Sequence, residues 1–154
     1  VTVKHFAANN QETNRYGNSS NVSERALREI YLRGFGICIR EAEPLCLMTS
    51  YNLINGAHST ERYDLCTEIL RHEFGFEGVA MTDWWVGMMV SRKENIYPGV
   101  QARRVAAAGV DLMMPGSRDD YDNLLRGLRN GKVSRGQLEI NATRVYRLLQ
   151  KLTR

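Results

Sequence analysis

The sequence has few cysteines and no cysteine pair of the kind that binds zinc. The sequence has three cysteines, Cys38, Cys46 and Cys66, and an odd number of cysteines cannot all form disulfides within the chain. None of them belongs to a C-x-x-C motif. A disulfide scaffold and a zinc module are therefore not expected. The three histidines also lack metal-ligand spacing, so we assign neither a metal nor a cofactor. Unpaired cysteines favour a reducing compartment, and we expect a cytoplasmic protein.

Long apolar runs and targeting signals are missing as well. No run approaches the roughly 18 apolar residues that a membrane span needs, which excludes a transmembrane protein. The chain opens on Val1 rather than Met and has no basic and apolar leader, so we expect a segment from within a longer protein. With 154 residues, of which 43% are hydrophobic and 25% charged, the composition is that of one ordinary folded domain.

Several motifs of nucleotide-binding proteins and hydrolases are also absent. The sequence contains neither G-x-x-x-x-G-K-[ST] nor G-x-G-x-x-G, which removes the usual cradles for phosphates and dinucleotides. Ser50 lacks the flanking glycines of a nucleophile elbow. A serine hydrolase of that kind is therefore not expected.

The formal net charge of +4 comes from the C-terminal part of the chain, where residues 118–154 hold nine basic and four acidic residues. These basic residues are spread through two amphipathic helical patterns without a recognised binding motif. Solvated helix faces explain this pattern better than a phosphate-binding stripe does. No nucleic-acid partner is expected.

Short apolar runs at 45–48, 79–81 and 110–114 predict buried strands, and a fourth, cut short, opens the chain at 1–3. Each run is nearly continuous, as in strands buried on both faces of a parallel sheet. Helical spacing follows each run. The helix boundaries are predicted near Ser23, Gly75, Gly109, Gly131 and Ser134, with Gln137 completing a capping box at the last start.

This alternation of strands and helices predicts an α/β fold with a parallel sheet. The strands recur about every 30–35 residues, which matches the roughly 31 residues per unit of a (β/α)8 TIM barrel. We therefore expect a partial barrel of about four βα units plus a C-terminal helix. The alternative is a small open doubly wound sheet, which a chain of this length could complete.

In parallel α/β folds, functional residues collect at the carboxyl ends of the strands, and Asp83 is the most informative residue there. It directly follows an apolar run and precedes Trp84 and Trp85. Aromatic faces stack on sugar rings while charged groups bind hydroxyls, so this combination suits a carbohydrate. The alternative is that Asp83 caps the next helix. For Tyr51, packing and support of a neighbouring carboxylate both remain open.

Six segments together resemble glycoside hydrolase family 3, in particular bacterial β-glucosidases. They are KHFAANNQE at 4–12, SERALREIYL at 23–32, MTSYN at 48–52, GFEG at 75–78, MTDW at 81–84 and AGVDLMMPG at 108–116. The resemblance runs in order over nearly the whole chain, and it is to the second half of the family's barrel domain. It implies that residues 1–154 are the C-terminal half of that (β/α)8 barrel, with the remaining barrel and the acid/base-bearing domain absent.

The resemblance also implies roles for individual residues. Asp83 matches the catalytic nucleophile of a retaining glycosidase, which forms a covalent glycosyl-enzyme. Lys4 and His5 match the pair that binds hydroxyls of the cleaved sugar. The remaining matches are Met48 and Tyr51, which line that subsite, and Trp84, an aromatic wall for the leaving sugar. A cation such as Lys4 would favour the ionised form of the nucleophile.

The expected activity is hydrolysis of terminal β-linked glucose, with a β-glucoside as the substrate and the rest of the parent enzyme as the partner. Retaining hydrolysis needs a second carboxyl, and nothing in the chain matches the family's acid/base. The isolated chain is therefore expected to be inactive. The alternative is a non-catalytic sugar-binding or scaffold fragment that keeps the pocket motifs. A half barrel could also cover its unpaired edge strands by forming a homodimer.

Overall fold

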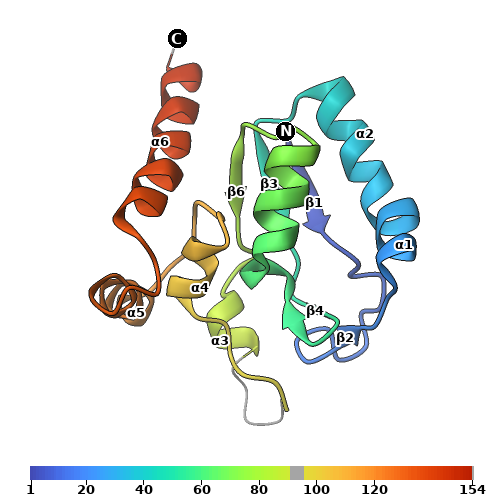
Figure 1. Ribbon diagram of the computed structural model, residues 1–154, viewed down its shortest axis with the longest axis horizontal. Helices are drawn as coiled ribbons and strands as arrows, with labels where there is room; N and C mark the ends of the chain where they lie inside the picture. The colour runs from blue at the N-terminus through green and yellow to red at the C-terminus, as the bar shows by residue number, and fades with distance from the viewer. Residues whose placement is uncertain (91–95, 154) are drawn as a thin grey trace.

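The computed structural model describes residues 1–90 and 96–153, and it contains a parallel sheet flanked by helices (Figure 1). The sheet consists of β1 (Thr2–Phe6), β3 (Cys46–Thr49) and β6 (Val79–Met81) in the order β1-β3-β6. Both strand pairs are parallel. An isolated parallel bridge between Met81 and Leu112 continues the sheet beyond β6. The predicted α/β class and the parallel strand direction are therefore confirmed.

The helices follow the strands along the chain. Their bounds are α1 (Glu24–Ala26), η1 (Leu27–Leu32), α2 (Arg33–Ala42), η2 (Ser59–Glu61), η3 (Asp64–Glu73), α3 (Val86–Val90), α4 (Ala102–Ala107), α5 (Arg118–Arg129) and α6 (Arg135–Leu152). α1, η1 and α2 succeed one another without a break, and in η1 and η3 the hydrogen bonds are those of a π-helix.

The predicted helix starts at serine residues are confirmed by their side-chain caps. Ser23 Oγ accepts a hydrogen bond from Ala26 N, and Ser134 Oγ accepts one from Gln137 N at 3.0 Å. The second half of the predicted capping box is wrong, because the Gln137 amide donates to Asn141 Oδ1 at 2.8 Å instead. Asn141 is itself buried in α6 and binds α4 and the chain beyond it, which explains the diversion.

Other parts of the sequence prediction need correction. The first strand extends to Phe6, so Lys4 and His5 lie within β1 rather than after it. The predicted strand at 110–114 is only the single bridge at Leu112. A small second sheet was not predicted, since its strands are only two residues long. It comprises β2 (Ser19–Ser20), β4 (Leu53–Ile54) and β5 (Ala57–His58).

The two faces of the main sheet differ in burial. On one face Leu47, Thr49 and Ala80 are completely buried, and Leu47 and Ala80 belong to a core that also holds apolar residues of η1, α2 and η3. On the other face Val79 is completely buried, but Cys46, Met48 and Met81 are only half-buried. One face of the sheet is therefore covered by helices, while the other remains partly open.

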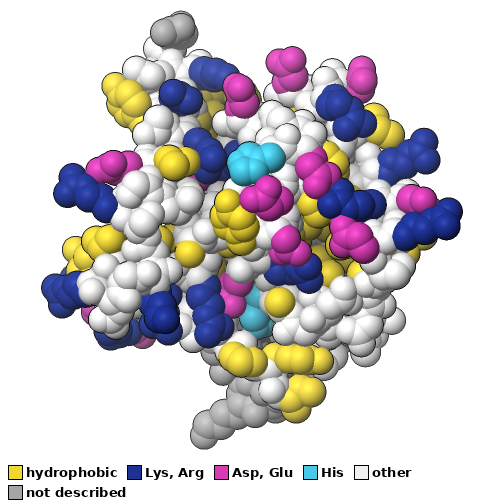
Figure 2. All heavy atoms as spheres, in the orientation of Figure 1, with side chains coloured by type: hydrophobic (Ala, Val, Ile, Leu, Met, Phe, Trp, Pro, Cys, Tyr) yellow, Lys and Arg dark blue, Asp and Glu magenta, His cyan; other side chains and the backbone are white. Residues whose placement is uncertain are grey.

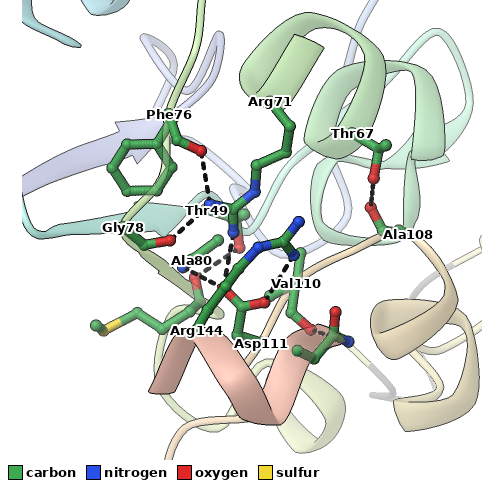
Figure 3. A network of polar contacts seen from close by, with 12 residues as sticks. Thr49, Thr67, Arg71, Phe76, Gly78, Ala80, Ala108, Val110, Asp111 and Arg144 are labelled. Atoms are coloured by element: carbon green, nitrogen blue, oxygen red, sulfur yellow. Dashed lines mark hydrogen bonds and ion pairs between the residues drawn. The ribbon is translucent and has the colours of Figure 1, made fainter. Parts of the chain in front are cut away.

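A buried polar network joins η3, the chain at Leu112 and α6 around Asp111 (Figure 3). Asp111 Oδ2 accepts from Arg71 Nη2 at 2.7 Å and from the backbone N–H of Ala80 at 2.8 Å, while Oδ1 accepts from Arg144 at 3.1 Å. Arg71 also donates to the carbonyl oxygens of Phe76 and Gly78. The Asp111 side chain is fully enclosed, and burial raises its pKa while Arg71 lowers it.

Among the described residues, none of the helices combines the length and the apolar character that crossing a membrane requires. Acidic side chains lie among the basic ones on the face shown in Figure 2. Ion pairs along α5 and α6 join Arg118 to Asp122 and Arg135 to Glu139. Part of the C-terminal basic charge is thus paired along these helices.

Candidate active site

The residues predicted to carry chemistry lie at one edge of the sheet, where parallel strands present their carboxyl ends. Lys4 and His5 are on β1, Tyr51 follows β3, and Asp83 follows β6. Register places Phe6 opposite Thr49 and Met48 opposite Met81. The sheet therefore brings residues that are far apart in sequence to the same edge.

Asp83 is almost buried, with 8% of its surface exposed. His5 Nε2 lies 3.5 Å from Asp83 Oδ2, and the backbone N–H of Trp84 donates to Oδ1 at 3.2 Å. No hydrogen bond within the described residues joins Asp83 to α3, which begins at Val86. The carboxylate is thus turned toward β1, and the alternative prediction that it caps the next helix is not supported.

Burial raises the pKa of Asp83 above its ordinary value of 3.8, since desolvation disfavours the charged carboxylate. Four groups act in the opposite direction and lower this pKa. In order they are the charge on His5, the neighbouring hydroxyl group of Tyr51, the charge on Arg15 and the charge on Lys4. Lys4 favours the ionised form, as predicted, but its effect is the smallest of the four, and His5 is the main electrostatic partner.

Tyr51 packs into the core, and its hydroxyl group lies near Asp83. Its side chain is 5% exposed, and its ring packs edge-on against Tyr16 with centroids 4.9 Å apart. Its hydroxyl donates to the carbonyl oxygen of Trp84 at 2.6 Å. Burial and the neighbouring Asp83 raise the pKa of Tyr51 to about 12, so the phenol keeps its proton beside the carboxylate.

The side chains of the two remaining predicted residues make no polar contact with Asp83 within the described part of the chain, although the backbone N–H of Trp84 does. Trp84 is 51% exposed. Met48 is half-buried on β3, beside Met81, on the partly open face of the sheet. These two side chains can provide apolar surface, and nothing in their geometry suggests proton transfer.

Arg15 also lies near the candidate site, and the sequence analysis did not predict it. Its guanidinium carbon lies 5.0 Å from the ring centroid of Tyr51 and 5.1 Å from that of Tyr16, and it also pairs with Glu12 at 2.8 Å. Its charge lowers the pKa of Asp83. Arg15 lies in a loop without periodicity, and the only signal for it was its position three residues after the KHFAANNQE segment.

Among the described residues, the carboxylates of Asp83 and Asp111 are both buried near the sheet, and Asp83 is the one that lies beside polar side chains at the strand ends. No group of three metal-ligating side chains occurs within residues 1–90 and 96–153. A parallel α/β fold with polar groups gathered at the carboxyl ends of its strands is the arrangement of α/β proteins that bind ligands at that edge.

The sequence model described as the glycosyl hydrolase family 3 N terminal domain matches residues 1–148. The chain belongs to this family.

Individual relatives agree with this assignment. The chain is 39% identical over 148 residues to a β-glucosidase of Ruminococcus albus, covering 94% of this chain and 15% of that protein. It is 40% identical over 153 residues to an exo-α-(1→6)-L-arabinopyranosidase of Bifidobacterium breve, covering 98% of this chain and 18% of that protein. The chain therefore spans less than one-fifth of the length of these relatives.

Solved structures show the same similarity in three dimensions. β-Glucosidase 3B of Thermotoga neapolitana, in complex with glycerol, superposes with a TM-score of 0.84 at 38% identity, over 96% of this chain and 20% of that one. A family 3 β-glucosidase of Bifidobacterium adolescentis also gives 0.84, at 39% identity, over 97% of this chain and 20% of that one.

Proposed function

We propose that this chain carries the nucleophile of a retaining glycoside hydrolase that cleaves terminal β-linked glucose. The observation that supports this most is the nearly buried Asp83 at the strand ends, which lies 3.5 Å from His5 and near Tyr51. The R. albus relative is a β-glucosidase, which supports the choice of a glucoside. The arabinopyranosidase relative shows that other sugars occur among similar chains.

In this mechanism a carboxylate oxygen of Asp83 attacks the anomeric carbon. The glycosidic C–O bond breaks, and its electron pair goes to the leaving oxygen, which takes a proton from a general acid. Water then cleaves the glycosyl ester and restores the carboxylate. The general acid must stand about 5–5.5 Å from Asp83, and we assign it to a part of the parent protein outside this chain.

The other strand-end residues are proposed to bind the sugar. Lys4 and His5 donate to hydroxyls of the cleaved sugar, and Met48 with Tyr51 lines its subsite. Hydrogen bonds to these hydroxyls that strengthen in the oxocarbenium-like transition state lower the barrier. Trp84 offers its exposed ring to the leaving group, in keeping with aromatic stacking on sugars.

We further propose that residues 1–154 form the C-terminal half of a (β/α)8 barrel. Two observations support this: Cys46, Met48 and Met81 face the less covered side of the sheet, and the chain spans only 15–18% of its relatives. In the parent protein, meaning the polypeptide that joins this chain to the rest of the barrel, that side becomes the interior. Produced alone, the chain would instead cover it by forming a homodimer. Three unpaired cysteines support a reducing, cytoplasmic setting.

Hydrolysis of an aryl β-glucoside tests the proposed function. We expect the parent protein to release the aryl alcohol, and the isolated 154-residue chain to be slower by at least about 10²–10⁴-fold, the contribution of general acid–base catalysis. A parent protein that binds glucose but hydrolyses no glycoside supports the scaffold alternative and contradicts the proposal. Turnover of an unactivated glucoside by the isolated chain, lost on Asp83→Ala, would show that the chain holds its own acid.

A further inference from the structure

Buried side chains fix the backbone that follows β1. Ser50 Oγ donates to the carbonyl oxygen of Ala7 at 3.0 Å, and Asn52 Nδ2 donates to the carbonyl oxygens of Ala7 at 3.3 Å and Ala8 at 3.1 Å. Ser20 Oγ donates to Ala8 as well, at 2.8 Å. Ser50 and Asn52 are 1% and 0% exposed, so water does not compete for these bonds. Two consecutive carbonyl groups are thus held by four hydrogen bonds.

The surroundings of Asn52 require an amide donor at this position. Its Nδ2 faces three backbone carbonyl oxygens, those of Ala7, Ala8 and Leu53, and none of these can donate to an oxygen in the same place. Its Oδ1 is buried and has no hydrogen-bond partner among the described residues. A buried polar atom without a partner destabilises a fold. Asn52 therefore stabilises the backbone through the N–H groups of its amide, while the oxygen of the same amide stays without a hydrogen bond.

The backbone that Asn52 holds is strained. Ala8 has a φ of +58°, a left-handed conformation that an alanine adopts only when its surroundings impose it. On the same segment, Ser50 N donates to the carbonyl oxygen of Phe6 at 2.9 Å. Residues 6–8 are consequently bound to residues 50–52, the segment that carries Tyr51.

These contacts connect the candidate catalytic groups. His5 precedes the held segment directly, and its Nε2 lies 3.5 Å from Asp83 Oδ2. Tyr51 lies between Ser50 and Asn52, and its hydroxyl reaches the carbonyl group of Trp84 beside Asp83. A shift of residues 6–8 therefore moves His5 relative to both Asp83 and Tyr51.

We propose that Asn52 and Ser50 are positioning residues, which hold residues 6–8 so that Lys4 and His5 face Asp83 at the distance that the reaction requires. This inference rests on the proposed function for its effect on catalysis, but not for its effect on the backbone. Neither side chain touches the substrate. Their contribution is made through Lys4 and His5, and a misplacement of about 1 Å costs on the order of 10²-fold in rate.

The test compares Asn52→Ala with Asn55→Ala in the parent protein. Asn55 is a matched control, because it is an asparagine on the same hairpin that makes two hydrogen bonds, to the N–H and the carbonyl group of Val22, away from Asp83. We expect Asn52→Ala to lower kcat/KM on an aryl β-glucoside by about 10–100-fold, mainly through kcat, and Asn55→Ala to change it less than 2-fold. A loss of thermal stability with unchanged kcat/KM in the folded protein would overturn the inference.

A double-mutant cycle adds a readout that a merely structural role would not move. Ser50 and Asn52 share the carbonyl group of Ala7, so the effects of Ser50→Ala and Asn52→Ala on kcat/KM should not multiply. The effects of Asn52→Ala and Asn55→Ala should multiply. If Asn52→Ala does not fold, Ser50→Ala removes one bond to the same carbonyl group and tests the inference with a smaller expected effect.

Amide hydrogen exchange separates this inference from the proposed function. Asn52→Ala should speed exchange within residues 4–9, whereas Asn55→Ala should speed it within residues 19–22. If the wild-type parent protein hydrolyses no glycoside, the proposed function fails and exchange alone decides the inference. Unchanged exchange in residues 4–9 of Asn52→Ala would contradict it.

Discussion

The Asp83→Asn variant of the parent protein is expected to lose at least about 10⁴-fold in kcat/KM on aryl β-glucosides. The amide has almost the size of the carboxyl group and can still accept from the Trp84 N–H, but it has no charge and cannot form the glycosyl ester. Initial rates of the purified variant measure this loss. Asp119→Asn is the matched control, because Asp119 is exposed on α5, and its activity should match the wild type.

The same substitution should not unfold the protein. Burial raises the pKa of Asp83, so above that pKa the ionised carboxylate disfavours the folded state, and a neutral amide removes this penalty. A melting temperature at or above that of the wild type, together with lost activity, separates a chemical role from a structural one. Loss of less than about 10-fold in kcat/KM would contradict the assignment of Asp83 as nucleophile.

The Asp111→Ala variant is expected to lose about 3–5 kcal/mol of unfolding free energy, because it leaves the buried charge of Arg71 unpaired. The Arg71 side chain is 4% exposed, and burial lowers its pKa to about 10 although Asp111 raises it. The variant also removes the hydrogen-bond acceptor of the Ala80 backbone N–H and that of Arg144 on α6. Urea unfolding of the 154-residue chain, followed by circular dichroism, measures the loss.

Asp122→Ala is the control for this prediction. Asp122 also pairs with an arginine, Arg118, but both side chains are largely exposed, and such pairs contribute about 0–1 kcal/mol. Replacing Arg71 by methionine in the Asp111→Ala background should restore part of the stability, since the unpaired charge is then removed. Equal effects of Asp111→Ala and Asp122→Ala would contradict the structural role of the network.

The elements that the sequence predicted well are those with local signals. Ser23 and Ser134 mark helix starts through their own hydroxyl groups. The apolar run at 79–81 forms a strand of the parallel sheet, in which Val79 and Ala80 are completely buried and Met81 is half-buried. The apolar run at 110–114 has a similar composition, but only Leu112 forms a β-bridge, with Met81. Whether such a run pairs along its length depends on the neighbouring strand and not on its own composition. Strands of two residues, such as β4, carry no periodicity at all.

The candidate site was partly predictable for the same reason. Asp83 was visible because an apolar strand leads directly to it, and the cation expected beside it was Lys4. In the structure His5 has the largest electrostatic effect on the pKa of Asp83, and Arg15 approaches Tyr51 from a loop. Both facts depend on the tertiary structure, which the local sequence does not show. The partners of Asp111 are 40 and 33 residues away in the chain, at Arg71 and Arg144, and no pattern in the sequence links them.

Covalent labelling tests the central claim most directly. A 2-deoxy-2-fluoro-glucoside with an activated leaving group needs the nucleophile and its pocket, but depends little on the general acid. Intact-mass measurement of the treated parent protein should show one glycosyl group per chain, and peptide mapping should place it on Asp83. A label on any other carboxylate, or no label on folded and glucose-binding protein, would contradict the assignment of Asp83 as the nucleophile.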